Sequence, residues 1–205
     1  MHLLLREAAM IHYKKVDKTY FPQYDAIPML VHVSSVYRIE KIHRGLGGFS
    51  FVETPVEPYT KDMSVYEIAA EYEEHFDISN WAVFMAFDGE EAVGGITLAS
   101  RTDGLDMLSG RDDLAVLWDI RVDDRYKRVG VGQALFDRGI EWARGEGLRQ
   151  MKIECQNNNV PACRFYHKQG AVLSAVDEYA YHHEPECRSE VQLIWMLDLP
   201  PSAKA

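Results

Sequence analysis

Apolar runs alternate with segments of helical spacing along the second half of the chain. Residues 114–122 are apolar except for Asp119 and Arg121, which predicts a central strand covered on both faces. Residues 129–144 place apolar side chains three and four positions apart, which predicts an amphipathic helix. Shorter apolar or alternating runs predict three further strands, at 151–155, 171–181 and 190–199.

The first half of the chain has the pattern of strands joined by turns. Apolar residues alternate loosely from 31 to 42, and a short strand is expected at 49–52, before Pro55 and Pro58 interrupt the pattern. Two more apolar runs flank Asp88-Gly89, a dipeptide typical of a hairpin turn, and they predict strands at 81–87 and 92–98.

Polar residues mark the starts of two further helices. Ser64 is followed three positions later by Glu67, as in a capping box, which predicts a helix at 65–76. Asn159 can cap another helix that runs to about residue 168. This order of elements predicts the α/β (α+β) class, with a mixed central sheet of about six to seven strands and helices on both faces.

Length and composition are typical of one globular domain. The chain has 205 residues, of which 47% are apolar and 26% are charged. Residues 1–30 follow no clear pattern and are expected to form an N-terminal extension, with a single domain from 31 to 200.

Charge and cysteine usage restrict the partners and the compartment. The formal net charge of −10 argues against a nucleic-acid partner. It would tolerate a cationic small molecule, although solubility alone is the simpler explanation for an acidic chain. The three cysteines form no Cys-x-x-Cys pair, so a reducing compartment is favoured. Leu3-Leu4-Leu5 is too short for a signal peptide or a membrane span, so we expect a cytoplasmic protein without a membrane partner.

The segment that follows the central strand carries the clearest chemistry. Polar residues lead into Val129-Gly130-Val131-Gly132 and then into the predicted helix. Glycine lets the backbone turn sharply and approach a ligand closely, and the amides at a helix start favour a phosphate group. Lys127 and Arg128 add positive charge, so an anion is expected to bind here. The alternative is a tight strand-to-helix turn without a ligand.

Two nucleotide-binding motifs match this segment less well. A P-loop ends in Gly-Lys-Ser/Thr, whereas Gly132 is followed by Gln133 and Ala134. A dinucleotide fingerprint requires a third small residue where Leu135 stands, although Glu154 lies about where a ribose-binding acid would fall. The dinucleotide hypothesis is weakened by this comparison and stays open.

Two stretches resemble the signatures of a known family. Residues 126–135 (YKRVGVGQAL) resemble the coenzyme A motif of the GNAT acetyltransferases, and residues 159–170 (NVPACRFYHKQG) resemble their second signature. Within that family, residues 153–167 are most similar to the streptothricin acetyltransferases. The resemblance implies the GNAT fold and acetyl transfer from acetyl-CoA to a primary amine in a ternary complex. Lys127 and Ala171 depart from the family pattern, which usually has Arg or Gln and Phe at these positions.

The resemblance also implies a set of cofactor-binding residues. The central strand and the second signature would face the pantetheine arm, and the glycine-rich turn with its two cations would face the pyrophosphate. The implied residues are Ile120, Arg121, Val122, Asn159 and Ala162 for the first group, and Lys127, Arg128, Val129, Gly130, Val131 and Gly132 for the second.

Three residues are candidates for catalysis. The family's Phe-Tyr pair implies that Tyr166 is the acid for the leaving thiolate, and the alternative is an aromatic core residue. Asp119 stands in an apolar strand and could be the base or could bind the substrate ammonium, unless it only pairs with Arg121. Glu154 is a second candidate base, or a solvated strand residue.

The acceptor is the least determined part of the prediction. We expect a small cationic amine such as streptothricin. The alternatives are a protein or peptide N-acetyltransferase and a non-catalytic acyl-CoA sensor. A homodimer through apolar surface at 179–181 is a further expectation. No metal site is expected, because His182, His183 and Cys187 lack zinc-site spacing and a fourth ligand.

Overall fold

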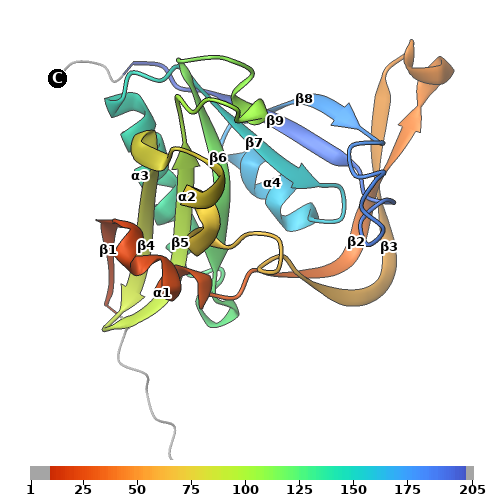
Figure 1. The fold of residues 1–205 in the computed structure, drawn as a ribbon. Helices are drawn as coiled ribbons and strands as arrows, with labels where there is room; N and C mark the ends of the chain where they lie inside the picture. Colours follow the sequence, from red (N-terminus) through yellow and green to blue (C-terminus); the bar gives the residue numbers. More distant parts are fainter. Residues whose placement is uncertain (1–9, 202–205) are drawn as a thin grey trace, which may run out of the picture.

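A seven-stranded mixed sheet forms the centre of the molecule (Figure 1). The structure is a computed structural model that describes residues 10–201. The strands of the sheet are β1 (Ile11–Val16), β4 (Ala82–Asp88), β5 (Glu91–Ala99), β6 (Leu114–Val122), β7 (Gln150–Gln156), β8 (Val172–Asp177) and β9 (Gln192–Asp198). Their order is β1-β4-β5-β6-β7-β9-β8. Only β6 and β7 run parallel, and every other neighbouring pair is antiparallel.

Helices cover both faces of this sheet. On one face, α3 (Val131–Gly145) and α4 (Val160–Lys168) bury Leu135, Phe136 and Tyr166 in one apolar cluster. On the other face, α1 (Phe21–Asp25) and α2 (Tyr72–His75) bury aromatic rings in a second cluster. Short 3₁₀ turns occur at Lys18–Tyr20, Ile42–Gly45, Ala69–Glu71, Ile78–Asn80, Asp106–Leu108 and Asp124–Tyr126. The predicted fold class is confirmed, with helices on both faces of the mixed sheet.

The central strands β6 and β7 separate half-way along their length. They pair only from Leu114–Gln150 to Leu117–Ile153. Immediately afterwards, the register of β6 against β5 shifts, and Trp118 is the extra residue of a bulge. A bulge bends its strand, so β6 diverges from β7, while β7 stays paired with β9 as far as Gln156. A V-shaped opening results at the middle of the sheet.

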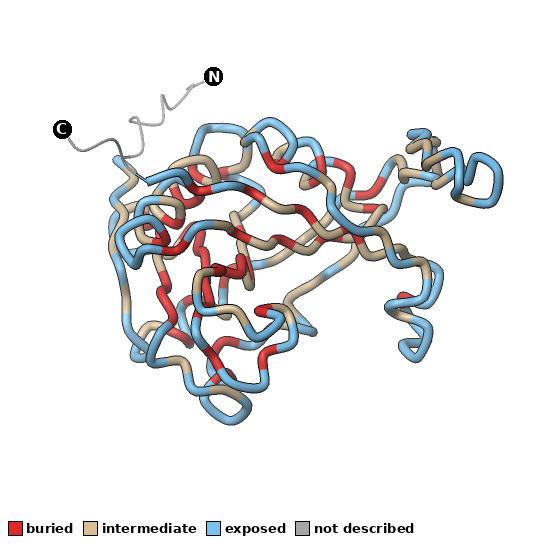
Figure 2. Tube along the Cα trace, turned by 90° about the horizontal axis from the view of Figure 1, so that it is seen from above, coloured by how far each residue is buried: buried red, intermediate tan, exposed pale blue. Residues whose placement is uncertain are grey.

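A long two-stranded arm projects from the body. It consists of β2 (Leu30–Lys41) and β3 (Phe49–Asp62), and it extends away from the sheet in both ribbon views (Figures 1 and 2). The strand expected at 49–52 is therefore much longer and includes Pro55 and Pro58. An isolated two-stranded ribbon tolerates proline because its outer edge needs no ladder donor.

The base of the arm is tied to the body by polar contacts. Lys61 pairs with Glu190 at 2.7 Å, and both side chains are largely buried. The amide of Tyr37 donates to the carbonyl of Asn157 at 2.9 Å, and the Asn157 side chain donates back to Tyr37. These contacts fix the arm beside the end of β7.

Residues expected to form an extension belong in part to the domain. β1 pairs with β4 along its whole length, and Tyr24 and Ile27 are almost fully buried against the sheet. The boundary expected at residue 30 therefore does not separate the described residues 10–30 from the domain. Residues 1–9 lie outside the described part of the chain. Among residues 10–201, no helix is long and apolar enough to cross a membrane.

The helix expected at 65–76 is wrong over its first half. The chain becomes helical only at Ala69, because Asp25 accepts hydrogen bonds from the amides of Ala69 and Ala70, at 2.7 and 3.1 Å, and thus supplies the N-terminal acceptor. The Ser64 hydroxyl accepts instead from the amide of Met29 at 2.9 Å. Residues 63–68 consequently form a turn and a short irregular segment, and Met63 and Glu67 from it line the V-shaped opening.

Candidate active site

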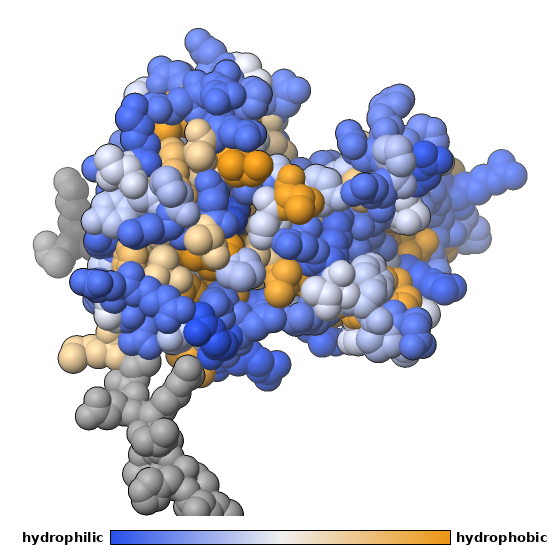
Figure 3. Space-filling model, turned by 60° about the horizontal axis from the view of Figure 1, so that its bottom comes forward, coloured by the Kyte–Doolittle hydropathy of each residue, from blue (hydrophilic) through white to orange (hydrophobic). Residues whose placement is uncertain are grey.

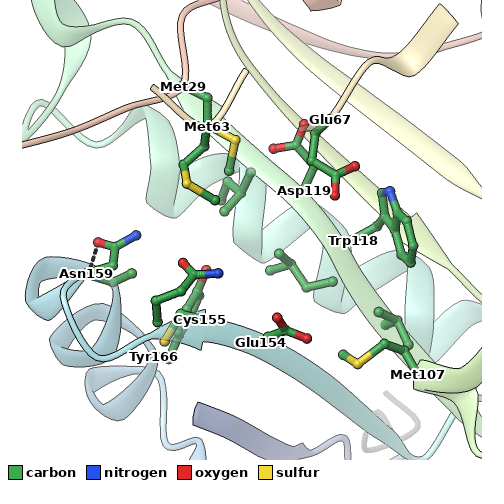
Figure 4. Close-up of a pocket in the computed structure, with 15 residues that line it drawn as sticks. Met29, Met63, Glu67, Met107, Trp118, Asp119, Glu154, Cys155, Asn159 and Tyr166 are labelled. Atoms are coloured by element: carbon green, nitrogen blue, oxygen red, sulfur yellow. Dashed lines mark hydrogen bonds between the residues drawn. The ribbon is translucent and has the colours of Figure 1, made fainter. Parts of the chain in front are cut away.

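A cavity of about 250 Å³ occupies the opening between β6 and β7. Its lining comes from β6, β7, α4 and the two segments that flank the arm (Figure 4). The lining residues are Met29, Met63, Glu67, Met107, Val116, Leu117, Trp118, Asp119, Ile120, Glu154, Cys155, Gln156, Asn159, Ala162 and Tyr166. All three predicted catalytic residues, with Ile120, Asn159 and Ala162, are therefore brought together.

Asp119 forms a fully buried ion pair with Arg121. The Arg121 Nε donates to Asp119 Oδ2 at 2.8 Å, and its Nη2 donates to the same oxygen. Burial raises the pKa of Asp119, and the charge of Arg121 opposes that rise. The structural pairing considered for Asp119 is thus present, while Oδ1 of the same carboxylate is buried without a hydrogen-bond partner among residues 10–201.

Arg121 also connects β6 to the wall of the cavity. Its guanidinium donates to the backbone carbonyl of Glu67 at 3.0 Å and to that of Ile27 at 3.4 Å. The ring of Tyr24 lies against the guanidinium, with 4.8 Å between Cζ and the ring centroid. Arg121 therefore holds two loop segments on the face of the sheet that carries Asp119.

Glu67 is a cavity residue that the sequence pattern misplaced. Its side chain and that of Asp119 both line the cavity, on the side opposite Glu154 (Figure 4). Burial and, after it, the negative charge of Asp119 together raise the pKa of Glu67 to about 7. The capping-box pattern gave Glu67 a helix-capping role, so sequence reasoning missed it. No other feature of the sequence around Glu67 indicates a place in a cavity.

Glu154 enters the cavity from β7, opposite Glu67. Its Oε1 accepts from the Tyr181 hydroxyl at 2.6 Å, and its Oε2 accepts from the Gln192 amide at 2.8 Å. Both carboxylate oxygens are therefore fixed by donors. Tyr181 belongs to the apolar patch expected on the surface at 179–181, but it is half-buried, whereas Tyr179 and Ala180 are exposed. The homodimer expected through this patch stays a prediction.

Tyr166 lies on α4 with its side chain at the cavity wall. The residue is 4% exposed, and its ring packs against Phe136 and Phe165 with centroids 6.3 and 5.6 Å apart. Burial raises the pKa of Tyr166 well above its ordinary value. The hydroxyl is therefore protonated at neutral pH and can donate to a group in the cavity.

The start of α3 offers free backbone amides. Arg128 and Gly130 both have positive φ, at 65° and 100°, and the first helical hydrogen bond runs from Ala134 to the carbonyl of Gly130. The amides of Val131 to Gln133 therefore precede the helical ladder and can bind an anion. A Cβ added at Gly130 would contact no neighbouring atom, so lack of space does not explain the glycine. Its left-handed backbone conformation does.

The two cations beside this turn differ in their surroundings. Lys127 donates to the carbonyl of Leu30 at 2.7 Å and pairs with Asp124 at 2.5 Å, so it contacts protein groups. Arg128 is exposed at the turn.

On α4, the predicted cap is confirmed, because Asn159 accepts from the amide of Ala162 at 3.2 Å. No set of His, Cys, Asp and Glu side chains that could hold a metal occurs within residues 10–201.

Comparisons with known proteins identify the family. The model of the acetyltransferase (GNAT) family matches residues 50–171, which is more than half of the chain. The chain belongs to this family. Streptothricin acetyltransferase of Escherichia coli is 29% identical to this acetyltransferase over 160 residues, which cover 78% of the chain and 82% of the relative.

Solved structures share the fold of this acetyltransferase. Nourseothricin acetyltransferase superposes with a TM-score of 0.74 at 22% identity, over 94% of this chain and 100% of the other. A Bacillus anthracis str. Ames protein, solved in complex with acetyl coenzyme A, superposes with a TM-score of 0.73 at 23% identity, over 94% and 99% of the two chains.

The site is chemically suited to the cosubstrate of the family. The chain is an acetyl-CoA-dependent N-acetyltransferase. The pantetheine arm of acetyl-CoA carries amide groups, and beyond Leu117 and Ile153 the diverging strands no longer pair with each other, which exposes backbone groups to such amides. The pyrophosphate is anionic, as the free amides at the start of α3 require. The acetyl thioester supplies the electrophilic carbonyl for the amine.

Proposed function

We propose that this acetyltransferase transfers the acetyl group of acetyl-CoA to a primary amine of a small cationic molecule, with streptothricin as the first candidate. The observation that carries the proposal is that three carboxylate side chains line the cavity. Glu67, Asp119 and Glu154 line it, and the buried cation Arg121 pairs with Asp119. Only one of the three carboxylates is paired with that cation, so a cationic ligand complements the remainder.

The apolar lining supports a flexible organic acceptor. Met29, Met63 and Met107 contribute adaptable thioether side chains, and the Trp118 ring can face an ammonium group. The names of relatives point the same way, since streptothricin acetyltransferase of Escherichia coli aligns over most of this chain. We place the reaction in the cytoplasm, because the three cysteines form no paired framework.

We assign the cosubstrate to two groups of residues. The backbones of Ile120, Arg121 and Val122, with Asn159 and Ala162, would hold the pantetheine arm. The turn from Val129 to Gly132 would hold the pyrophosphate, together with the exposed Arg128. Lys127 would join it only by leaving Leu30 and Asp124. Tyr166 would protonate the departing sulfur.

Thiol release from acetyl-CoA tests the function directly. The release is followed with a thiol reagent, with streptothricin, a simple alkylamine, a lysine-containing peptide, or no acceptor. Streptothricin that is already acetylated on its amine is the matched control, because it keeps the scaffold and lacks the nucleophile. Release that depends on the free antibiotic supports the proposal. Release with the peptide alone contradicts the small-molecule acceptor, and a separate titration confirms coenzyme A binding in either case.

A further inference from the structure

An alkylammonium acceptor must lose a proton before its nitrogen can attack a thioester. With a pKa near 10.4, only about one such molecule in 10³ to 10⁴ is neutral at pH 7. We propose that Glu67 takes this proton, while Glu154 on the opposite wall holds the cationic acceptor in place. The inference rests on the proposed function and assigns different tasks to the carboxylates of the cavity.

The backbone around Glu67 is fixed, which is a requirement for a positioned base. Arg121 binds the carbonyl of Glu67 itself at 3.0 Å, and Asp25 binds the amides of Ala69 and Ala70 two and three residues later. The carboxylate enters the cavity beside Trp118, whose buried indole Nε1 has no hydrogen-bond partner among residues 10–201. A fixed backbone with a side chain in the cavity suits proton transfer.

The surroundings of Glu67 bring the pKa of its carboxyl group close to neutral pH. Asp119 and Arg121 face it from β6, and Glu154 faces it from β7. Burial and the negative charges of Asp119 and Glu154 together raise the pKa of Glu67 to about 7, against the opposing charge of Arg121. A base is most effective when its pKa is near the working pH, because enough of it is ionised and it still binds the proton well.

The other two carboxylates are committed to partners. One carboxylate oxygen of Asp119 accepts hydrogen bonds from Arg121, and both residues are buried. Glu154 accepts from Tyr181 and Gln192 with its two oxygens. A carboxylate held by two donors is suited to binding a cation in a fixed position. By this contrast, Glu67 is the carboxylate left to exchange protons.

The proton balance of the reaction is complete with these groups. The ammonium nitrogen gives one proton to Glu67, which later releases it to solvent. The neutral nitrogen then forms the C–N bond to the acetyl carbon as the C–S bond breaks. Tyr166 gives its proton to the departing sulfur, and the second proton of the nitrogen passes through solvent to the Tyr166 phenolate, which restores the hydroxyl.

The pH dependence of the Glu67→Gln variant tests the inference. For the unaltered enzyme, kcat/KM for streptothricin should rise with pH up to about 7 and then level off, as Glu67 becomes ionised. In the variant, kcat/KM at pH 7 should be lower than in the unaltered enzyme by about 10²-fold or more. It should then rise continuously to pH 9, about tenfold per pH unit, because only the neutral amine reacts.

Three matched variants separate catalysis from structure. Glu67→Asp retains a carboxylate and should restore the levelling at neutral pH. Glu154→Gln should raise KM for the acceptor and keep the shape of the profile. Glu71→Gln changes an exposed glutamate on the same segment and should match the unaltered enzyme. Coenzyme A titration and thermal unfolding report whether each variant is folded.

The outcomes distinguish the inference from the proposed function. A deficit of Glu67→Gln that is constant across pH, or smaller than about threefold at pH 7, overturns the role of Glu67. If the unaltered enzyme itself releases no thiol with any amine, the proposed function fails, and the inference fails with it.

Discussion

The hydroxyl of Tyr166 combines deep burial with access to the cavity. The ring is held by Phe136 and Phe165 on the α3–α4 side of the sheet, and the residue lines the opening between β6 and β7. Because its raised pKa keeps the hydroxyl protonated, it can donate to a sulfur that gains negative charge as the C–S bond breaks. The ring supplies packing, and the hydroxyl is the group to which we assign the protonation of the sulfur.

Replacing Tyr166 with phenylalanine separates these two contributions. Tyr166→Phe keeps the packed ring, so thermal unfolding and coenzyme A affinity should change little. We expect kcat to fall by about 10²-fold or more, since a positioned acid typically contributes 10² to 10⁴. The measurement is steady-state thiol release at saturating acceptor. A loss smaller than about threefold would show that the hydroxyl is not the acid.

At the level of residues, sequence predicts the cofactor side of the site better than the acceptor side. Asn159 and Tyr166 lie in one local motif, so their spacing alone brings them to the cavity. Asp119 was predicted either as a base or as the partner of Arg121, and only the fold shows that this arginine also binds the carbonyls of Ile27 and Glu67. Contacts across such sequence distances leave no periodic pattern.

Among the elements, β5 shows how small residues let helices approach both faces of one strand. A Cβ on Gly94 would lie 3.1 Å from Leu135 and Val131 of α3. A Cβ on the next residue, Gly95, would lie 2.7 Å from Cδ2 and 3.1 Å from Cζ of Tyr24 in α1. The two glycines therefore set the distance of one helix on each face, and Gly95 positions the ring that lies against Arg121.

The Gly95→Ala substitution should force Tyr24 away from the sheet. Both the ring and the strand are buried, so we expect a loss of about 1–3 kcal/mol in the free energy of unfolding. For a chain of this length, each 1 kcal/mol lowers Tm by about 2–4 °C. Thermal unfolding measures the effect. Gly145→Ala, where no atom lies within 4 Å of the new Cβ, is the control and should not lower Tm.

Elements defined by continuous patterns were predicted well, and those decided by distant contacts were not. The predicted strand at 114–122 coincides with β6, because its apolar run reflects burial on both faces. The helix at 65–76 begins late because Asp25, which is distant in sequence, provides its acceptor. The strand at 31–42 corresponds to β2, whereas the second strand of the arm was predicted too short for a related reason: its prolines signal a break, and a free ribbon edge tolerates them.

The molecule as a whole is acidic, and the face shown in Figure 3 is mostly hydrophilic. The formal charge is −10, and the face in Figure 3 carries small, separate apolar areas between hydrophilic side chains. The cavity concentrates the same sign of charge on Glu67 and Glu154. A cleft lined by one sign of charge raises the local concentration of oppositely charged ligands. Net charge and cavity charge therefore act in the same direction on a cationic acceptor and against an anionic cosubstrate.

Salt should consequently change the two Michaelis constants in opposite directions. The Debye length is about 30 Å at 10 mM and about 8 Å at 150 mM ionic strength, so salt removes the long-range part of both interactions. We expect KM for streptothricin to rise severalfold as KCl increases over this range, and KM for acetyl-CoA to stay level or fall. Initial rates at fixed pH, with one substrate saturating, measure each constant. A parallel rise of both constants would indicate a general effect of salt on the enzyme. A flat response for the acceptor would mean that its affinity comes from close contacts in the cavity, where screening is weak.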